Sequence, residues 1–527
     1  MSRLVVCNAR IEGTSFDSIL MEDGVITKLA GSRELSALPD AEVIDVHGAY
    51  VSPGFIDSHM HLLEYGQFLS QLNLFNVHSR EALLARVEAA VKNETSEDSW
   101  IIGRGFNEEQ FDVSELPSLE ALNAVSGKHP VALTRACGHQ MLVNSKAMAA
   151  AGIDGDTMIA GGTIDFQNGR LYENAINVVH DAEPKPDFNQ VKEWLLKAMK
   201  QMNRYGVTAC GSDDFMSTGA DWKIVMDAYG QLSYQQRMTV RVSQQCEFES
   251  PESFASFLDE GYSTGIGDDF FVIGPLKLVC DGSLGAHTAA MSEPYRDKKD
   301  EKGILLYDNE EMLVLMKLAA QFNMPTICHA IGDRAVDQVL KNLKKVNLPG
   351  NPLGHGLVHC QIMRPDQIKQ IQEMNLNCYI QSAFIEDDAP ILENRVEKTR
   401  ADTSYPYATL FRSVNTSNGS DAPVTEPDVM KGIQLAVTRK TTDGKSAMNP
   451  KECLTADEAL ASYTSRGAKA LQMDIGEIAI GKKGDLAVLE KDPRTLAGNE
   501  IASNRVLLTI ANGEVVFDAN EANGRQE

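Results

Sequence analysis

The sequence predicts an α/β fold: a (β/α)8 barrel of the TIM type with a small β-sandwich domain built from both ends of the chain. Short apolar, strand-like segments alternate with amphipathic helical segments through the middle of the chain. Polar residues end strand after strand, as in barrels, whose sites lie at the carboxyl ends of the strands. No Gly-x-Gly-x-x-Gly opens a helix near the N-terminus, which disfavours the alternative, a doubly wound dinucleotide-binding sheet.

The alternation can be followed unit by unit. Apolar residues recur at helical spacing from Phe188 to Met202, Gly206 ends this helix, and a buried strand follows from Val207. Further helix and strand pairs are predicted at 312–322 and 325–329, 336–346 and 356–359, 365–374 and 376–381, and 407–411 and 415–421.

The two ends of the chain differ from the middle. Short β runs without long helices fill both ends, and Asn512-Gly513 is a hairpin signal. We therefore predict that residues 1–52 and 478–527 form the β-sandwich domain. The barrel then occupies 53–477, with a long insertion after its first strand at about 62–130.

Two histidines one residue apart, His59 and His61, follow an apolar stretch that predicts the first barrel strand. Alternate side chains of a strand point to the same side, so both imidazoles can face one point. Two imidazole nitrogens that face one point can bind a metal ion, although such a pair alone is weak evidence for a metal site.

Other strand ends supply further candidate ligands. His329, His359 and Asp421 each end a predicted strand, and Lys277 lies inside the apolar run 271–280. An uncompensated ammonium is costly to bury. Lys277 is therefore either a paired core lysine or a lysine carboxylated by CO₂ that bridges two metals. The combination predicts a metal centre at the mouth of the barrel.

The chain resembles the amidohydrolase superfamily, in the branch of N-substituted formamide deformylase-like metal-dependent hydrolases (amidohydrolase family 3). The resemblance spans nearly the whole chain, and its most distinctive block begins Lys-Leu-Val-Cys-Asp-Gly-Ser-Leu-Gly at Lys277. The matching segments are 51–61, 137–145, 169–173, 277–289, 329–335, 419–423 and 476–486.

This resemblance implies hydrolysis of a C–N bond in an amide-like substrate (N-formyl, N-acyl or cyclic amide) by a metal-activated hydroxide. It implies about two divalent metal ions, zinc first among them. Asp421 is the implied general base. One metal is held by His59, His61 and Asp421, the other by His329 and His359, with carboxylated Lys277 as the bridge.

The chain departs from the branch pattern at three places. Val358 precedes His359 where an acidic residue is frequent, and Gln381-Ser382 replaces Gln-Pro. Gly332-Asp333 follows His329 instead of the His-x-x-Glu proton shuttle of aminohydrolases, which disfavours deamination. Deamination, isomerisation and lyase chemistry remain alternatives, as does a catalytically silent ligand-binding protein on the same fold.

Four residues outside the metal set need an interpretation. His139 and Glu173 lie in branch motifs and are candidate substrate-binding residues; a structural histidine and a solvated carboxylate are the alternatives. Asp213 and Asp214 end a strand and could line the barrel mouth, but a helix cap is the favoured interpretation for both.

Composition limits the partners. The 527 residues carry a net charge of −25, so nucleic acid and anionic membranes would be repelled. Nine cysteines without a Cys-x-x-Cys pair suggest reduced thiols and a cytoplasmic protein. We expect a small-molecule substrate as the partner, with a homodimer as an open alternative to a monomer.

Overall fold

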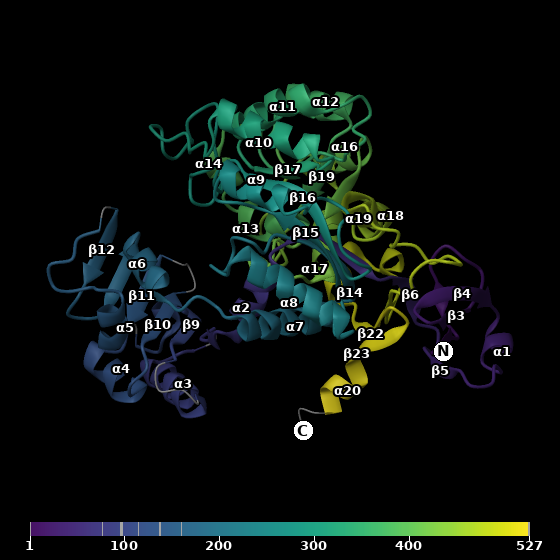
Figure 1. The fold of residues 1–527 in the computed structure, drawn as a ribbon, viewed down its shortest axis with the longest axis horizontal. Coiled ribbons are helices and arrows are strands. Elements are labelled where there is room, and N and C mark those ends of the chain that lie inside the picture. Colours follow the sequence, from purple (N-terminus) through teal and green to yellow (C-terminus); the bar gives the residue numbers. More distant parts are fainter. Residues whose placement is uncertain are drawn as a thin grey trace. The chain divides into compact units, whose positions relative to one another are not determined.

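The computed structural model of the chain consists of two compact units (Figure 1), formed by residues 1–65 with 188–527 and by residues 66–187. The structure describes residues 2–75, 77–94, 99–113, 115–135, 139–159 and 161–524. Within these ranges, no helix combines the length and the apolar character that a membrane span requires.

An eight-stranded parallel sheet forms the centre of the larger unit. Within this sheet, strands that are adjacent in space follow one another along the chain, which is the pattern of a barrel. The strands are β7 (Phe55–Met60), β14 (Val207–Ser212), β15 (Arg241–Cys246), β16 (Phe271–Val279), β17 (Thr326–Ala330), β18 (Gly356–His359), β19 (Asn377–Ile380) and β20 (Thr416–Asn418). Between the first and last strands, Ser58 Oγ donates to the carbonyl of Asn418 over 3.0 Å, and the amide of Asp421 donates to the carbonyl of His59 over 2.9 Å. These bonds draw the sheet towards closure, and the predicted barrel is confirmed.

Helices between the strands cover the sheet (Figure 1), and their apolar faces explain why they do so. Val336, Val339, Leu340 and Leu343 recur three or four residues apart in α11 and are all buried. The helices are α7 (Phe188–Arg204), α8 (Trp222–Tyr234), α9 (Pro251–Asp259), α10 (Asn309–Gln321), α11 (Asp333–Val346), α12 (Pro365–Met374), α16 (Tyr407–Phe411), α17 (Val429–Thr438), α18 (Ala456–Ser462) and α19 (Ser465–Leu471).

Both ends of the chain join in a small β domain of two sheets, as predicted (Figure 1). Its apolar core combines residues from the two ends, among them Ile19, Val51 and Ile510. Asn512 and Gly513, both with positive φ, form the predicted hairpin turn. One sheet contains β1 (Arg3–Cys7), β3 (Ser18–Glu22), β4 (Val25–Ala30) and β5 (Glu42–Asp45); the other contains β2 (Arg10–Ile11), β6 (Tyr50–Pro53), β21 (Leu486–Leu489), β22 (Val506–Ala511) and β23 (Glu514–Asp518).

The smaller unit is longer than the insertion expected at about 62–130, because it extends to residue 187. Residues 131–187 belong to it because their strands complete a six-stranded sheet of its own, in the order β12-β13-β11-β10-β9-β8. Its elements are β8 (Leu72–Asn73), α3 (Arg80–Asn93), β9 (Ile101–Phe106), α4 (Leu119–Ser126), β10 (Val131–Arg135), β11 (Gln140–Val143), α5 (Ser145–Ala150), β12 (Gly162–Asp165), β13 (Arg170–Glu173) and α6 (Ala175–Ala182).

Candidate metal centre

His59 and His61 stand at the carboxyl end of β7 and present one ring nitrogen each to Asp421. The distances from their Nε2 atoms to Asp421 Oδ1 are 3.2 and 3.3 Å. The other ring nitrogen of each is already engaged: Nδ1 of His59 lies 2.6 Å from Gln245 Oε1, and Nδ1 of His61 lies 2.9 Å from the carbonyl of Asp213. Since both acceptors require a hydrogen on Nδ1, the neutral form of each imidazole, which is the form that binds a metal, carries its lone pair on Nε2.

Asp421 is held firmly by the backbone that follows β20. Its own amide donates to His59, and the carboxylate of Asp57 accepts the amide of the preceding residue, Ser420, over 3.0 Å. Burial alone would raise the pKa of Asp421, but its contacts with His59 and His61 hold that pKa well below the usual range. The side chain is therefore a carboxylate at neutral pH.

These three groups fit a bound cation. Asp421 Oδ1 is buried and has no hydrogen-bond partner, although two imidazole nitrogens lie within 3.3 Å of it. Among the described residues, His59, His61 and Asp421 are the one group of this kind, with their ligand atoms all within 4.8 Å of one another. Nitrogen and carboxylate donors in such a cluster suit a divalent metal such as zinc.

Lys277 lies beside this cluster on β16 and is only 2 % exposed. Its Nζ is 3.3 Å from Asp213 Oδ2 and 3.5 Å from His59 Nε2. Burial lowers the pKa of this amine, but the nearby carboxylates of Asp213 and Glu247 outweigh it, and the pKa is raised overall. Lys277 therefore lies beside His59, and in this structure it is a paired lysine.

His329 and His359 extend the cluster on the next strands. Their ring centroids are 4.3 Å apart, and the ring of His359 is 5.7 Å from that of His59. His359 Nδ1 lies 2.8 Å from Gln381 Oε1, and His329 Nε2 lies 3.2 Å from the carbonyl of Gly282. The structure thus places the six predicted ligands in one continuous group at the carboxyl ends of the strands.

The family model described as "Amidohydrolase family" matches residues 42–517. The chain belongs to this family. A protein of Bacillus subtilis that bears the name "Putative amidohydrolase YtcJ" is 30% identical over 524 residues, and the match covers 96% of this chain and 97% of that protein. The N-substituted formamide deformylase of Arthrobacter pascens is 24% identical over 548 residues, and the match covers 98% of this chain and 99% of that protein.

A solved structure supports the same assignment. An uncharacterized metal-dependent hydrolase from Pyrococcus furiosus has a TM-score of 0.79 and 25% identity, covering 94% of this chain and 100% of that one. Family membership and this neighbour together support metal-dependent hydrolysis as the general activity of this amidohydrolase.

His139 and Glu173 belong to the smaller unit and contact each other. His139 Nδ1 lies 3.0 Å from Glu173 Oε2, and both side chains are exposed. Cys137 and Gly138, which begin the same motif, lie outside the described residues. The proposed substrate-binding role of this pair stays a prediction.

The favoured interpretation as a helix cap is wrong for Asp213, whereas Asp214 does cap a helix, because it accepts the amide of Leu63 in the first turn of α2 (Leu62–Ser70). Helix α8 is capped by Asp221. Asp213 lies beside Lys277, and Asp214 accepts hydrogen bonds from the amide of Leu63 and the hydroxyl of Tyr229. Both carboxylates are needed inside the barrel mouth, where they meet partners from distant parts of the chain.

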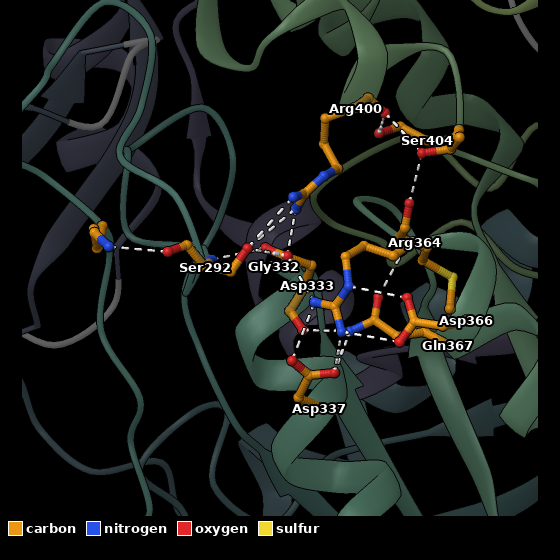
Figure 2. A network of polar contacts seen from close by, with 12 residues as sticks. Ser292, Gly332, Asp333, Asp337, Arg364, Asp366, Gln367, Arg400 and Ser404 are labelled. Carbon is orange, nitrogen blue, oxygen red and sulfur yellow. Dashed lines mark hydrogen bonds and ion pairs between the residues drawn. The ribbon is translucent and has the colours of Figure 1, made fainter.

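Asp333, which stands where aminohydrolases carry their shuttle motif, has a structural role (Figure 2). It is fully buried and accepts from the amide of Ser292 over 2.9 Å, from Arg364 over 3.0 Å and from Arg400. These partners come from three separate connections of the barrel. The carboxylate therefore holds these three connections together.

Proposed function

We propose that this amidohydrolase cleaves a C–N bond of an amide-like small molecule, with N-formyl, N-acyl and cyclic amides as the candidate classes. The observation that carries the proposal is the buried Asp421 Oδ1, which has no hydrogen-bond partner and faces the Nε2 atoms of two histidines. The likeness to an N-substituted formamide deformylase supports the choice of bond.

We further propose about two zinc ions per chain, which N and O donors suit. His59, His61 and Asp421 would hold one, and His329 and His359 the other. Lys277, carboxylated on Nζ, would bridge them; its burial next to His59 supports this position. When bound, such an ion lowers the pKa of water towards neutrality and polarises a carbonyl group.

The protein's own residues supply proton transfer and orientation. Asp421 Oδ2 is the atom proposed to take a proton from the attacking water and to return it to the leaving nitrogen. The low pKa of Asp421 keeps its side chain ionised, so Oδ2 carries no proton before the reaction. His139 and Glu173 remain the proposed contacts for the substrate.

The cellular setting of the protein is also a proposal. Eight described cysteines are free thiols, seven of them buried, which supports a reducing compartment such as the cytoplasm. The net charge of −25 supports a small-molecule substrate over nucleic acid or membrane partners.

A substrate panel tests the proposed reaction. Metal-loaded protein would be assayed for release of amine from N-formyl, N-acyl, lactam and imide compounds, with aminopurines and amino-pyrimidines as deamination controls. We expect turnover within the amide set that chelation abolishes. Ammonia release from the deamination set alone would contradict the proposal, and no turnover by fully metallated protein on any compound would favour a binding protein.

A further inference from the structure

Gln245 and Gln381 lie behind two of the histidines that carry the metal proposal. Gln245 is the last residue but one of β15, Gln381 directly follows β19, and both are fully buried. Gln245 Oε1 is 2.6 Å from His59 Nδ1, and Gln381 Oε1 is 2.8 Å from His359 Nδ1. Each glutamine therefore contacts the ring nitrogen that faces away from the centre.

The orientation of each amide is fixed by a second bond. Gln245 Nε2 donates to the carbonyl of Ser58 over 3.1 Å, and Gln381 Nε2 donates to the carbonyl of Tyr379 over 3.2 Å. Turning either amide over would place its oxygen against a carbonyl oxygen and its NH₂ group against the imidazole. The two backbone carbonyls thus keep Oε1 towards the histidine.

We infer that Gln245 and Gln381 are positioning residues that hold His59 and His359 in the Nδ1–H tautomer, with Nε2 free to bind metal. The inference rests on the proposed function, since it deepens the metal site. Metal-bound histidines usually donate their second N–H to a carboxylate, a backbone carbonyl or water. Here the acceptors are neutral amides, and His61 likewise faces the carbonyl of Asp213, whereas His329 Nε2 lies near both the carbonyl of Gly282 and the carboxylate of Asp281, at 3.2 and 3.4 Å.

Neutral acceptors have a chemical consequence. A carboxylate at either position would add a buried negative charge beside Lys277, Asp213 and Asp421, whereas an amide fixes the ring without adding charge. The glutamines therefore set ring orientation and tautomer, while Asp421 supplies the negative charge that a cation needs.

The first test reads the tautomers directly in metal-free protein. Long-range ¹H–¹⁵N NMR of protein labelled only in histidine, assigned with His59→Gln and His359→Gln, distinguishes hydrogen on Nδ1 from hydrogen on Nε2. We expect Nδ1–H at both residues. Hydrogen on Nε2 of His59 and of His359 in the wild-type protein would overturn the inference, whether or not zinc binds.

The second test measures the affinity for zinc by competition with a chromophoric chelator. Gln245→Leu removes the acceptor, and we expect its Kd for zinc to rise about 10- to 100-fold, the range usual for such partners. Gln245→Glu keeps an acceptor and should bind within about tenfold of wild type. Gln434→Leu is the matched control, because Gln434 is also buried and its Oε1 accepts from Ala502, away from the centre.

The outcomes separate the inference from the proposed function. If wild-type protein takes up no zinc, the proposed function fails, and the NMR result still decides the role of the glutamines. If wild type binds zinc and Gln245→Leu binds it equally well, the positioning role is wrong. If Gln245→Leu does not fold, the Kd for zinc of Gln381→Leu tests the positioning role at His359 in the same way.

Discussion

Replacing Asp333 by asparagine tests whether the ion-pair network of Figure 2 stabilises the barrel. Asp333 is fully buried, and it is the acidic partner of both Arg364 and Arg400. Removing one partner of a buried pair usually costs ~3–5 kcal/mol, because the other charge is left without compensation. Arg364 keeps Asp337 and Asp366 as partners, so we expect the lower end, about 3 kcal/mol.

The pH dependence of this loss has a definite sign. Burial alone would raise the pKa of Asp333, but its bonds to Ser292 and the two arginines lower that pKa overall. The ionised side chain therefore contributes its full stability above the unfolded pKa of about 3.9 and loses it as the pH falls through the folded pKa. The difference from wild type should be constant from about pH 7 to 5 and shrink below about pH 4.

The assay is urea unfolding of both proteins at a fixed metal content, followed by tryptophan fluorescence from about pH 7 to below about pH 4. Asp402→Asn is a suitable control, because that carboxylate is exposed and its ion-pair partner, Lys398, is exposed as well. A loss below about 1 kcal/mol at pH 7, or a loss that grows on acidification, would refute the reasoning.

Three further changes have expected outcomes. Asp421→Asn should lower kcat about 10²–10⁴-fold on any substrate found, with metal content measured alongside; activity within about tenfold of wild type would show that Asp421 is not the base. Phe257→Ala should destabilise the fold by ~3–5 kcal/mol in thermal or urea unfolding. The reason is that the buried ring of Phe257 packs against those of Trp222 and Phe248, with ring centroids 5.2 and 5.0 Å apart. A loss of stability under about 1 kcal/mol would contradict this packing. Lys277 should carry a carboxylate on Nζ in electron density of metal-loaded crystals, and a bare amine bonded to Asp213 there would leave a mononuclear site.

The parts of the site that the sequence predicted share one physical origin. A strand presents alternate residues to the same side, so His59 and His61 were predictable as a pair. Parallel strands in a barrel all end at the same face, so His329, His359 and Asp421 could be placed near them without knowing any contact. The barrel itself followed from the regular alternation of short apolar strands and amphipathic helices.

The missed residues depend on contacts that no local pattern reveals. Asp213 meets Lys277 across 64 positions of sequence, and Gln245 meets His59 across 186. A glutamine at the end of a buried strand carries no spacing signal, because its role depends on a partner from another strand. The extent of the smaller unit was missed for a similar reason: β9 to β13 pair in a mixed sheet, whose strands resemble barrel strands until their partners are known.

Metal analysis of protein purified without chelators tests the central claim most directly. Inductively coupled plasma mass spectrometry of wild type and of a His59→Ala/His61→Ala variant would give the bound metal per chain. The account predicts about two equivalents of divalent metal, chiefly zinc, in wild type and a marked loss in the variant. Less than about half an equivalent in wild type, with no uptake when zinc is added, would contradict it.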